Sequence, residues 1–338
     1  MGNKFKNKVD NSPNSYINYY DKKGNGKSGK IRNLLDCWWN VDKAVLLSEG
    51  RFLALKKHTK IIFDKYNYNK HIIIKDENCF IHDIIKIKNN FLIYGDNSGY
   101  IKVVLLENKT YTITQEIKAH KESIEKIIKL SDTCLITFSL DNNIIFFKFE
   151  NNILKKYRTI NIGHTIESLY LCKPNILLGS YCKLTEDNKH ISYFIIYDIN
   201  SNQLINKIRV KFSPNVSCIQ KLNKKYYLIA YDNNICFLNM FNYSIKKRFF
   251  SEFDFGTFTS CCKINNKTLL LSTSEGDIHI YNINKNANLI KINVYKFERI
   301  SIKYIVKYTD NRIIICGSTN GLEGFLSIFD ITTIISKE

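Results

Sequence analysis

The sequence has little of what many functional signatures require. Its 338 residues include three prolines, fourteen glycines and two tryptophans, and no apolar run approaches the length of a membrane span. The first residues lack the apolar stretch of a secretory signal, which favours a cytoplasmic or nuclear location. Gly2 is placed as N-myristoylation needs, but position 6 is Lys rather than Ser or Thr, so lipidation is left open.

Cysteine and histidine give no metal or disulfide signature. Ten cysteines occur without any Cys-x-x-Cys pair, and the only adjacent two are Cys261 and Cys262. Most of the others lie inside apolar runs, as Cys134 does in "TCLITF". Free buried thiols in a reducing compartment therefore fit best, and the seven scattered histidines supply no ligand spacing. We expect no cofactor.

Basic residues and aromatic residues are plentiful. The chain carries 50 Lys and Arg against 31 Asp and Glu, a net charge of +19, and its 21 Phe and 21 Tyr are ample for a core. Residues 1–36 hold eight of the basic residues and three acids, with no apolar period, which predicts a basic, largely disordered N-terminal arm. Its "DKKGNGKSGK" lacks the first glycine and the buried strand of a phosphate-binding loop.

From residue 37 onward one pattern recurs. Short apolar runs start at intervals of 40, 43, 42, 50, 42 and 44 residues, at Arg51, Phe91, Cys134, Ile176, Tyr226, Thr268 and Arg312. Each belongs to a unit of four short strands separated by turns rich in Asn, Asp, Gly and Lys. The fourth unit carries an insertion, "CKLTEDNKH", which explains the long interval.

Units of this size with their turn and aromatic marks resemble the blades of WD-repeat β-propellers. The resemblance rests on a histidine before the first strand, a tight turn after the second, and an aromatic–polar pair ending the third. It implies structural roles within blades for His120, His164, Asp141, Asp232, Gly276, Tyr281, Phe329 and Asp330.

The predicted fold is therefore all-β, a seven-bladed β-propeller of four-stranded antiparallel blades over residues 37–338. Closure of the ring has two alternatives. The fourth strand of the last blade is either "TIIS" near the C-terminus or a segment from the N-terminal side of the first blade.

No nucleophile motif, metal spacing or paired carboxylate emerges, so we expect that the protein is not an enzyme. The loops between first and second strands share one face of a propeller, and in units two to seven every such loop contains lysine. These lysines form a candidate basic face for partner binding, whereas acids such as Asp96 and Glu275 gather in the turns of the opposite face. The candidate residues are Lys86, Lys88, Lys129, Lys173, Lys224, Lys225, Lys263, Lys267 and Lys307.

The resemblance implies a non-catalytic scaffold, a rigid platform for protein partners within a multi-subunit complex; nothing indicates an oligomeric state. The alternative is a nucleic-acid or ribonucleoprotein-associated propeller that binds the phosphates of RNA, or another acidic surface, through the lysines. Exposed aromatic rings beside the lysines would support it, and Tyr226 and Tyr308 are candidates. Phosphoinositide binding is less favoured, because "KKRFF" at 246–250 lacks the glycine of the Phe-Arg-Arg-Gly motif.

Overall fold

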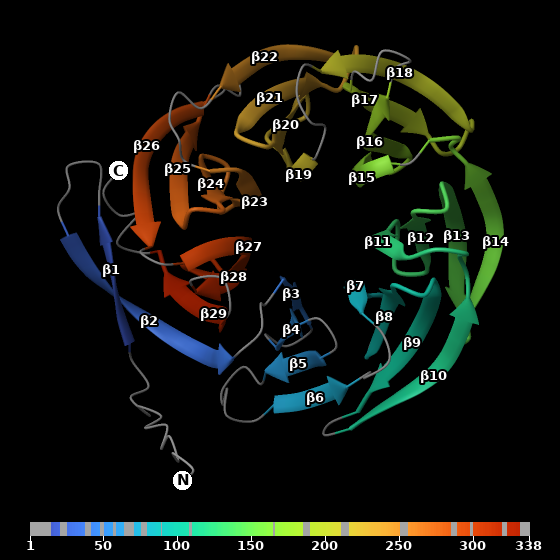
Figure 1. Ribbon diagram of the computed structural model, residues 1–338, viewed down its shortest axis with the longest axis horizontal. Coiled ribbons are helices and arrows are strands. Elements are labelled where there is room, and N and C mark those ends of the chain that lie inside the picture. Colours follow the sequence, from blue (N-terminus) through green and yellow to red (C-terminus); the bar gives the residue numbers. More distant parts are fainter. Residues whose placement is uncertain are drawn as a thin grey trace, which may run out of the picture.

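The strands of the computed structural model stand around a central opening (Figure 1). The described part of the chain contains no helix with the length and apolarity that a membrane crossing needs. The structure describes residues 15–20, 26–37, 42–47, 51–56, 59–63, 71–75, 80–88, 90–107, 110–164, 166–184, 190–210, 216–250, 256–284, 289–297, 300–319 and 323–331.

Five sheets have four antiparallel strands each, in chain order. Their strands are β3 (Lys43–Leu46), β4 (Phe52–Lys56), β5 (Thr59–Phe63) and β6 (His71–Lys75); β7 (Ile81–Lys86), β8 (Phe91–Asp96), β9 (Tyr100–Leu106) and β10 (Tyr111–Lys118); β11 (Ile124–Lys129), β12 (Cys134–Ser139), β13 (Asn143–Glu150) and β14 (Ile153–Asn161); β15 (Ile166–Lys173), β16 (Ile176–Leu184), β17 (His190–Asp198) and β18 (Gln203–Val210); and β19 (Val216–Lys221), β20 (Tyr226–Tyr231), β21 (Asn234–Asn239) and β22 (Ser244–Phe250).

The sixth sheet has nine strands in the order β23-β24-β25-β26-β1-β2-β29-β28-β27. These are β1 (Ser15–Tyr20), β2 (Gly26–Cys37), β23 (Phe258–Lys263), β24 (Thr268–Thr273), β25 (Asp277–Ile283), β26 (Leu289–Phe297), β27 (Ile300–Thr309), β28 (Arg312–Thr319) and β29 (Glu323–Asp330). The described strands thus form six separate sheets where the sequence predicts seven. The difference arises because β1 pairs with both β2 and β26 and joins two groups of strands.

The N-terminal segment bears on two predictions, the disordered arm and the closure of the ring. Residues 15–20 and 26–37 are strands, although the sequence predicts a largely disordered arm over 1–36. The reason is that β29 needs a neighbour on its outer edge, and β2 provides it from Ile31 opposite Phe329 to Cys37 opposite Gly324. Of the two alternatives for closure, the strand from the N-terminal side is observed beside β29, and "TIIS" at 333–336 lies outside the described part of the chain. Residues 1–14 lie outside the described part of the chain.

The tight turns need residues that tolerate positive φ. Gly276 and Asn142 have φ of 85° and 65°, in the left-handed region that Gly and Asn adopt at least cost. Space also limits Gly276, because a Cβ there would lie 2.3 Å from the Ile300 carbonyl oxygen. That carbonyl belongs to the strand that begins the next group, so the turn packs directly on its neighbour.

The core lies between neighbouring sheets. Each cluster of buried apolar residues draws on two consecutive groups of strands, such as Ile93 and Val103 with Leu135 and Phe147. The predicted aromatic wedges are part of it. Phe329 is buried and packs edge-on against Phe297 of the preceding group at 5.6 Å, and Tyr281 is half-buried beside residues of β20.

Candidate partner-binding face

Lysines at the end of the first strand link neighbouring groups of strands. Lys129 Nζ donates to the Ile87 carbonyl at 2.8 Å, Lys263 Nζ to Leu222 at 2.9 Å, and Lys307 Nζ to Ile264 at 2.8 Å. In each case the acceptor residue follows the equivalent strand-end position of the preceding group. Three of the nine predicted lysines therefore have a structural bond that the sequence did not indicate.

Lys173 makes a related bond in the other direction, from Nζ to the Met240 carbonyl at 2.8 Å in the following group. Lys86 is half-buried, and Lys88, Lys224, Lys225 and Lys267 are exposed. All nine lie in or beside the loops joining first to second strands, as the sequence predicts.

Two of the strand-end lysines are also neutralised by an acid three residues later. Lys129 pairs with Asp132 at 2.7 Å, and Lys307 pairs with Asp310 at 2.7 Å. The lysine bond holds the pKa of each aspartate below its usual value, and Lys88 and Lys86 act on Asp132 in the same direction. The charges of Lys129 and Lys307 are therefore compensated locally.

The same position differs in two of the three groups between them. Three residues after Lys221 stands Lys224, and three residues after Lys263 stands Asn266. In the described part of the chain no acid forms an ion pair with these three lysines or with Lys267. The basic section between the β19–β22 and β23–β26 groups is thus uncompensated.

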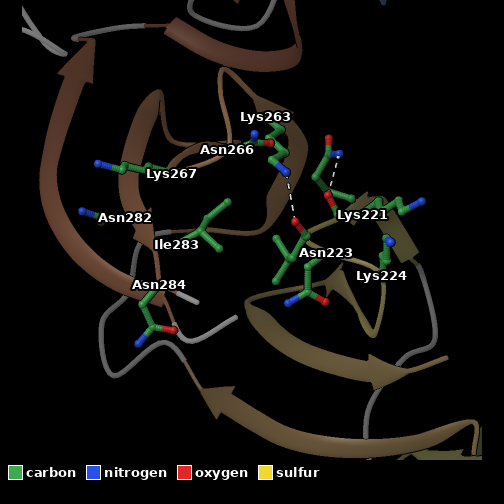
Figure 2. A pocket seen from close by; sticks show the side chains of 11 residues that line it. Lys221, Asn223, Lys224, Lys263, Asn266, Lys267, Asn282, Ile283 and Asn284 are labelled. Atoms are coloured by element: carbon green, nitrogen blue, oxygen red, sulfur yellow. Dashed lines mark hydrogen bonds between the residues drawn. The ribbon is translucent and has the colours of Figure 1, made fainter. Parts of the chain in front are cut away.

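This section forms an open pocket of about 900 Å³, which we call the lysine pocket (Figure 2). None of the described residues that line it is acidic. Lys267 and Asn282 lie on one side of it, and Lys221 and Lys224 lie on the other. The residues lining it are Gln220, Lys221, Leu222, Asn223, Lys224, Lys263, Asn266, Lys267, Asn282, Ile283 and Asn284.

The loops of the lysine pocket are held by asparagine side chains. Asn223 Oδ1 accepts the Lys225 and Tyr226 amides, each at 2.8 Å, and Asn265 Oδ1 accepts the Lys267 and Thr268 amides, each at 2.8 Å. Such side-chain turns order the backbone without a regular ladder. The lysines at the loop tips therefore project from fixed turns.

The charge of Lys263 is not fully stabilised. Burial lowers its pKa, and the neighbouring positive charge of Lys221 lowers it further. Neither effect is offset by an acid, so an anion in the lysine pocket would be favoured electrostatically.

Tyr226 and Tyr308, the aromatic residues proposed beside the lysines, already pack against other side chains. Lys225 and Lys246 lie over the Tyr226 ring at 5.5 and 4.7 Å, and Tyr308 packs edge-on against Phe52 at 5.7 Å. The exposed ring is instead Phe241, with 70% of its surface accessible. The exposure of Phe241 was not predicted, because a phenylalanine close to the end of a strand is more often part of the core.

The central opening contains a second cavity, of about 450 Å³, whose lining comes from β3, β7, β11, β15, β19, β23 and β27. Asp83 is buried there beside Lys43, and its other carboxylate oxygen accepts the Ile127 amide at 2.9 Å. Burial disfavours the Lys43 charge, but the Asp83 carboxylate outweighs it and the pKa is raised.

Lys126 of this cavity forms no ion pair with an acid of the described ranges, although the charge of Asp83 acts on it. Its Nζ lies 3.4 Å from the centroid of the Tyr170 ring, and burial lowers its pKa to about 8. The Tyr170 hydroxyl is within 2.9 Å of the carbonyls of Val216 and Ser217. The signal in the sequence is a charged residue inside an apolar first strand, as in "IHDII" and "IEKII".

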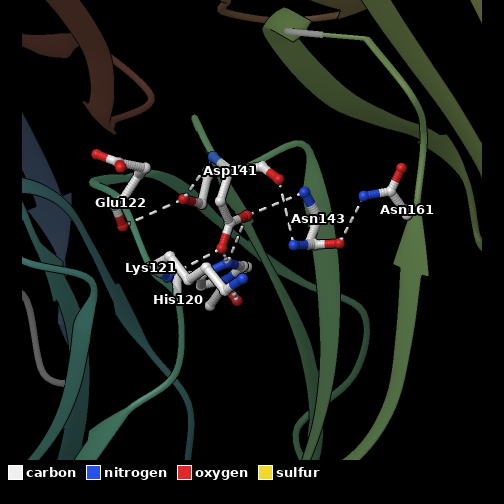
Figure 3. Close-up of polar contacts among 8 residues, drawn as sticks. His120, Lys121, Glu122, Asp141, Asn143 and Asn161 are labelled. Atoms are coloured by element: carbon white, nitrogen blue, oxygen red, sulfur yellow. Dashed lines mark hydrogen bonds and ion pairs between the residues drawn. The ribbon is translucent and has the colours of Figure 1, made fainter.

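The predicted structural residues of the turns divide into two kinds. His120 Nδ1 lies 3.1 Å from both carboxylate oxygens of Asp141, and Nε2 lies 2.8 Å from Thr137 Oγ1 (Figure 3). Asp141 also accepts the Lys121 and Asn143 amides at 3.0 Å. Burial lowers the His120 pKa despite the carboxylate.

His164 is placed differently. It is exposed and stacks on Tyr181 with 4.6 Å between ring centroids, so its side chain is not inside a blade network like that of His120. Asp232 has φ of 47° at its turn, where it takes the place of a glycine. Asp330 is exposed, 3.7 Å from Arg312 Nε. Within the described ranges no group of His, Cys, Asp and Glu is arranged to hold a metal ion.

Comparison with known proteins identifies the fold. No family model matches the sequence, and no curated protein matches it. The solved structure of U3-55K is similar over 89% of this chain and 98% of that chain, with a TM-score of 0.71 and 10% sequence identity. Because 1380 chains of solved structures match, the likeness does not select one function. The WD-repeat assignment stays a resemblance, and the fold of this chain is an all-β propeller of four-stranded antiparallel blades.

Proposed function

We propose that the protein is a non-catalytic interaction scaffold of the cytoplasm or nucleus, which binds a polyanionic partner at the lysine pocket within a multi-subunit assembly. One observation carries the proposal. The aspartates that neutralise Lys129 and Lys307 are replaced by Lys224 and Asn266 at the lysine pocket, where four lysines line one depression without an acid. Charge of one sign in a concave site attracts and orients an oppositely charged surface.

The scaffold is proposed to have seven blades. The nine-stranded sheet divides into β23–β26 and a group of β27, β28, β29 and β2, with β1 lying between them. Each of these groups has four antiparallel strands, and seven first strands line the central cavity. Counting by first strands therefore favours seven blades, one of which is completed by β2.

A non-catalytic role agrees with how the polar side chains are used. His120 and Asp141 hold a turn, and Asp83 joins Lys43 to the Ile127 backbone. A scaffold of this kind presents loops already ordered by the sheets, so binding loses little loop entropy.

The proposal is tested by affinity purification of the tagged full chain from its own cells, followed by mass spectrometry. The variant carries Lys221→Glu, Lys224→Glu and Lys267→Glu. Its matched control carries Lys155→Glu, Lys156→Glu and Lys183→Glu, three exposed lysines outside the lysine pocket with the same change in net charge. We expect the partners of the native chain to be lost from the first variant and kept by the second. Equal recovery from both would refute the lysine pocket as the docking site.

A further inference from the structure

The turn beside the lysine pocket carries an exposed aromatic ring. Phe241 lies in the turn between β21 and β22, where its amide donates to Asn239 Oδ1 at 3.0 Å. The preceding Met240 amide donates to the Lys225 carbonyl at 2.8 Å, which fixes this turn against the Lys224–Lys225 loop. Lys173 holds the Met240 carbonyl from the other side.

An exposed phenylalanine on a bonded turn is a preformed stacking surface. Unlike Tyr226, whose ring already lies against Lys225 and Lys246, Phe241 has 70% of its surface open to solvent. An unpaired nucleobase can stack on such a ring, whereas a base in a duplex cannot reach it.

The lysines are arranged for several anions rather than one. Lys221 and Lys224 lie across the lysine pocket from Lys267 (Figure 2). The side-chain amides of Asn266 and Asn282 line the same depression and offer N–H donors. Spaced charges with neutral donors between them fit a chain of phosphates better than a single compact ion.

We infer that the lysine pocket together with Phe241 binds a single-stranded nucleic acid, with phosphates on Lys221, Lys224 and Lys267 and a base stacked on Phe241. The inference rests on the proposed function, since it names the chemistry of the polyanion. An acidic protein would use the lysines but has no need of the exposed ring.

The test measures binding of a fluorescent twelve-nucleotide single strand of mixed sequence to the purified full chain by anisotropy, with RNA and DNA arms. We expect Phe241→Ala to weaken binding roughly 5- to 100-fold and Phe241→Tyr to restore most of it. The triple variant K221Q, K224Q and K267Q is expected to reduce the slope of log affinity against log salt by about 2, since each phosphate contact on a single strand contributes about 0.7. The same substitutions at Lys155, Lys156 and Lys183 should leave the slope unchanged.

Three competitors separate the outcomes. A duplex of the same sequence, polyglutamate, and vesicles containing phosphoinositide are each added to the preformed complex. If polyglutamate competes as well as the single strand and Phe241→Ala has no effect, the site recognises charge alone and the inference is overturned, while the proposed docking function stands. Preferential competition by the vesicles or by the duplex likewise overturns it. If the single strand does not bind but the Lys→Glu variant still loses its cellular partners, the partner is an acidic protein.

Discussion

Lysines at the end of the first strand differ in charge compensation, according to what stands three residues later. Lys129 and Lys307 are each neutralised by an aspartate at that distance, whereas Lys221 and Lys263, followed by Lys224 and Asn266, make no ion pair with any described acid. A lysine-rich sequence alone does not distinguish these two cases, because all of these residues lie in similar Lys- and Asn-rich loops.

The structural role predicts that Lys307→Met lowers the free energy of unfolding by about 1–2 kcal/mol, because the Ile264 carbonyl loses its charged donor. Lys267→Met, at an exposed position, should change it by less than about 0.5 kcal/mol. Urea unfolding of both variants measures the difference. Equal values would show that the bond to Ile264 contributes nothing to stability.

The network of His120 predicts a loss of about 1–3 kcal/mol for Asp141→Ala, since the Lys121 and Asn143 amides and the His120 ring lose their acceptor. Asp132→Ala, at an exposed carboxylate, is the control and should lower the free energy of unfolding much less. Thermal or urea unfolding at pH 7 compares them. If the control loses as much as Asp141→Ala, the His120 network is not the cause.

Acid should weaken the same network in two steps. Burial lowers the His120 pKa, so below the ordinary histidine value of about 6.5 the unfolded chain takes up a proton first and stability falls. Burial opposes the Asp141 charge, but the Lys121 and Asn143 amides and His120 outweigh it and lower that pKa. The Asp141 contribution is therefore present above about pH 4 and is lost as pH falls through its lower folded value.

Lys126 predicts a change of stability at alkaline pH. Its folded pKa of about 8 lies below the ordinary 10.5, so the unfolded chain binds the extra proton between these values, and stability should rise with pH across that interval. Lys126→Met removes this rise. At pH 7 the variant should be at least as stable as the native protein, because the cost of burying the Lys126 charge is removed. Urea unfolding of both proteins between pH 8 and pH 9.5 provides the comparison. Parallel curves would contradict a lowered Lys126 pKa.

At the scale of turns and strands, the middle hairpins depend on close approach to the next blade. Gly276→Ala should cost about 2–4 kcal/mol, because the added Cβ meets the Ile300 and Phe297 carbonyls at 2.3 and 2.5 Å as well as a positive φ. Gly163→Ala has a similar φ of 75° with nothing within 4 Å, so it should cost only about 1–2 kcal/mol. Urea unfolding of the two variants separates the cost of the close contact at Gly276 from the cost of positive φ. Equal losses of stability would mean that the positive φ alone accounts for both.

The strands show where the sequence is informative and where it is not. The spacing of the seven apolar runs predicted the second strand of each four-stranded group, from the strand that begins at Phe52 to the strand that ends at Thr319. This was possible because the same local order of strand, turn and aromatic residue recurs along the chain. The role of β2 was not predictable in this way. Residues 26–37 include two Gly, two Lys and one Arg, and they become a strand through a partner almost 300 residues later, which no local pattern reveals.

The candidate site was predictable only in outline. The repeat placed the lysine loops on one face, and the loop sequences "KLNKK" and "KINNK" show the missing acids once the blades are aligned. The exposure of Phe241 and the cavity cluster of Asp83, Lys43 and Lys126 depend on contacts between blades. Side-chain exposure of this kind follows from packing rather than from residue type.

For the whole molecule, closure of the ring is the feature most open to test. Deleting residues 1–37 removes β2 and leaves the outer edge of β29 unpaired, which should lower the melting temperature and promote aggregation. Deleting residues 1–25 removes β1 but keeps β2, and should have a smaller effect. Thermal unfolding and size-exclusion chromatography compare the two. Equal melting temperatures would mean that the pairing of β2 with β29 does not support the ring.

The pairing of β2 with β29 also imposes an order of events on synthesis. Residue 37 leaves the ribosome before residue 323, and at about 5–20 residues per second the partner strand follows roughly 15–60 s later. Throughout that time the edge of β2 that later pairs with β29 lacks this partner in a crowded cell. The net charge of +5 that the chain carries through Asp36 makes association between copies unfavourable. The basic N-terminal segment thus suits a strand that has to wait for the end of its own chain.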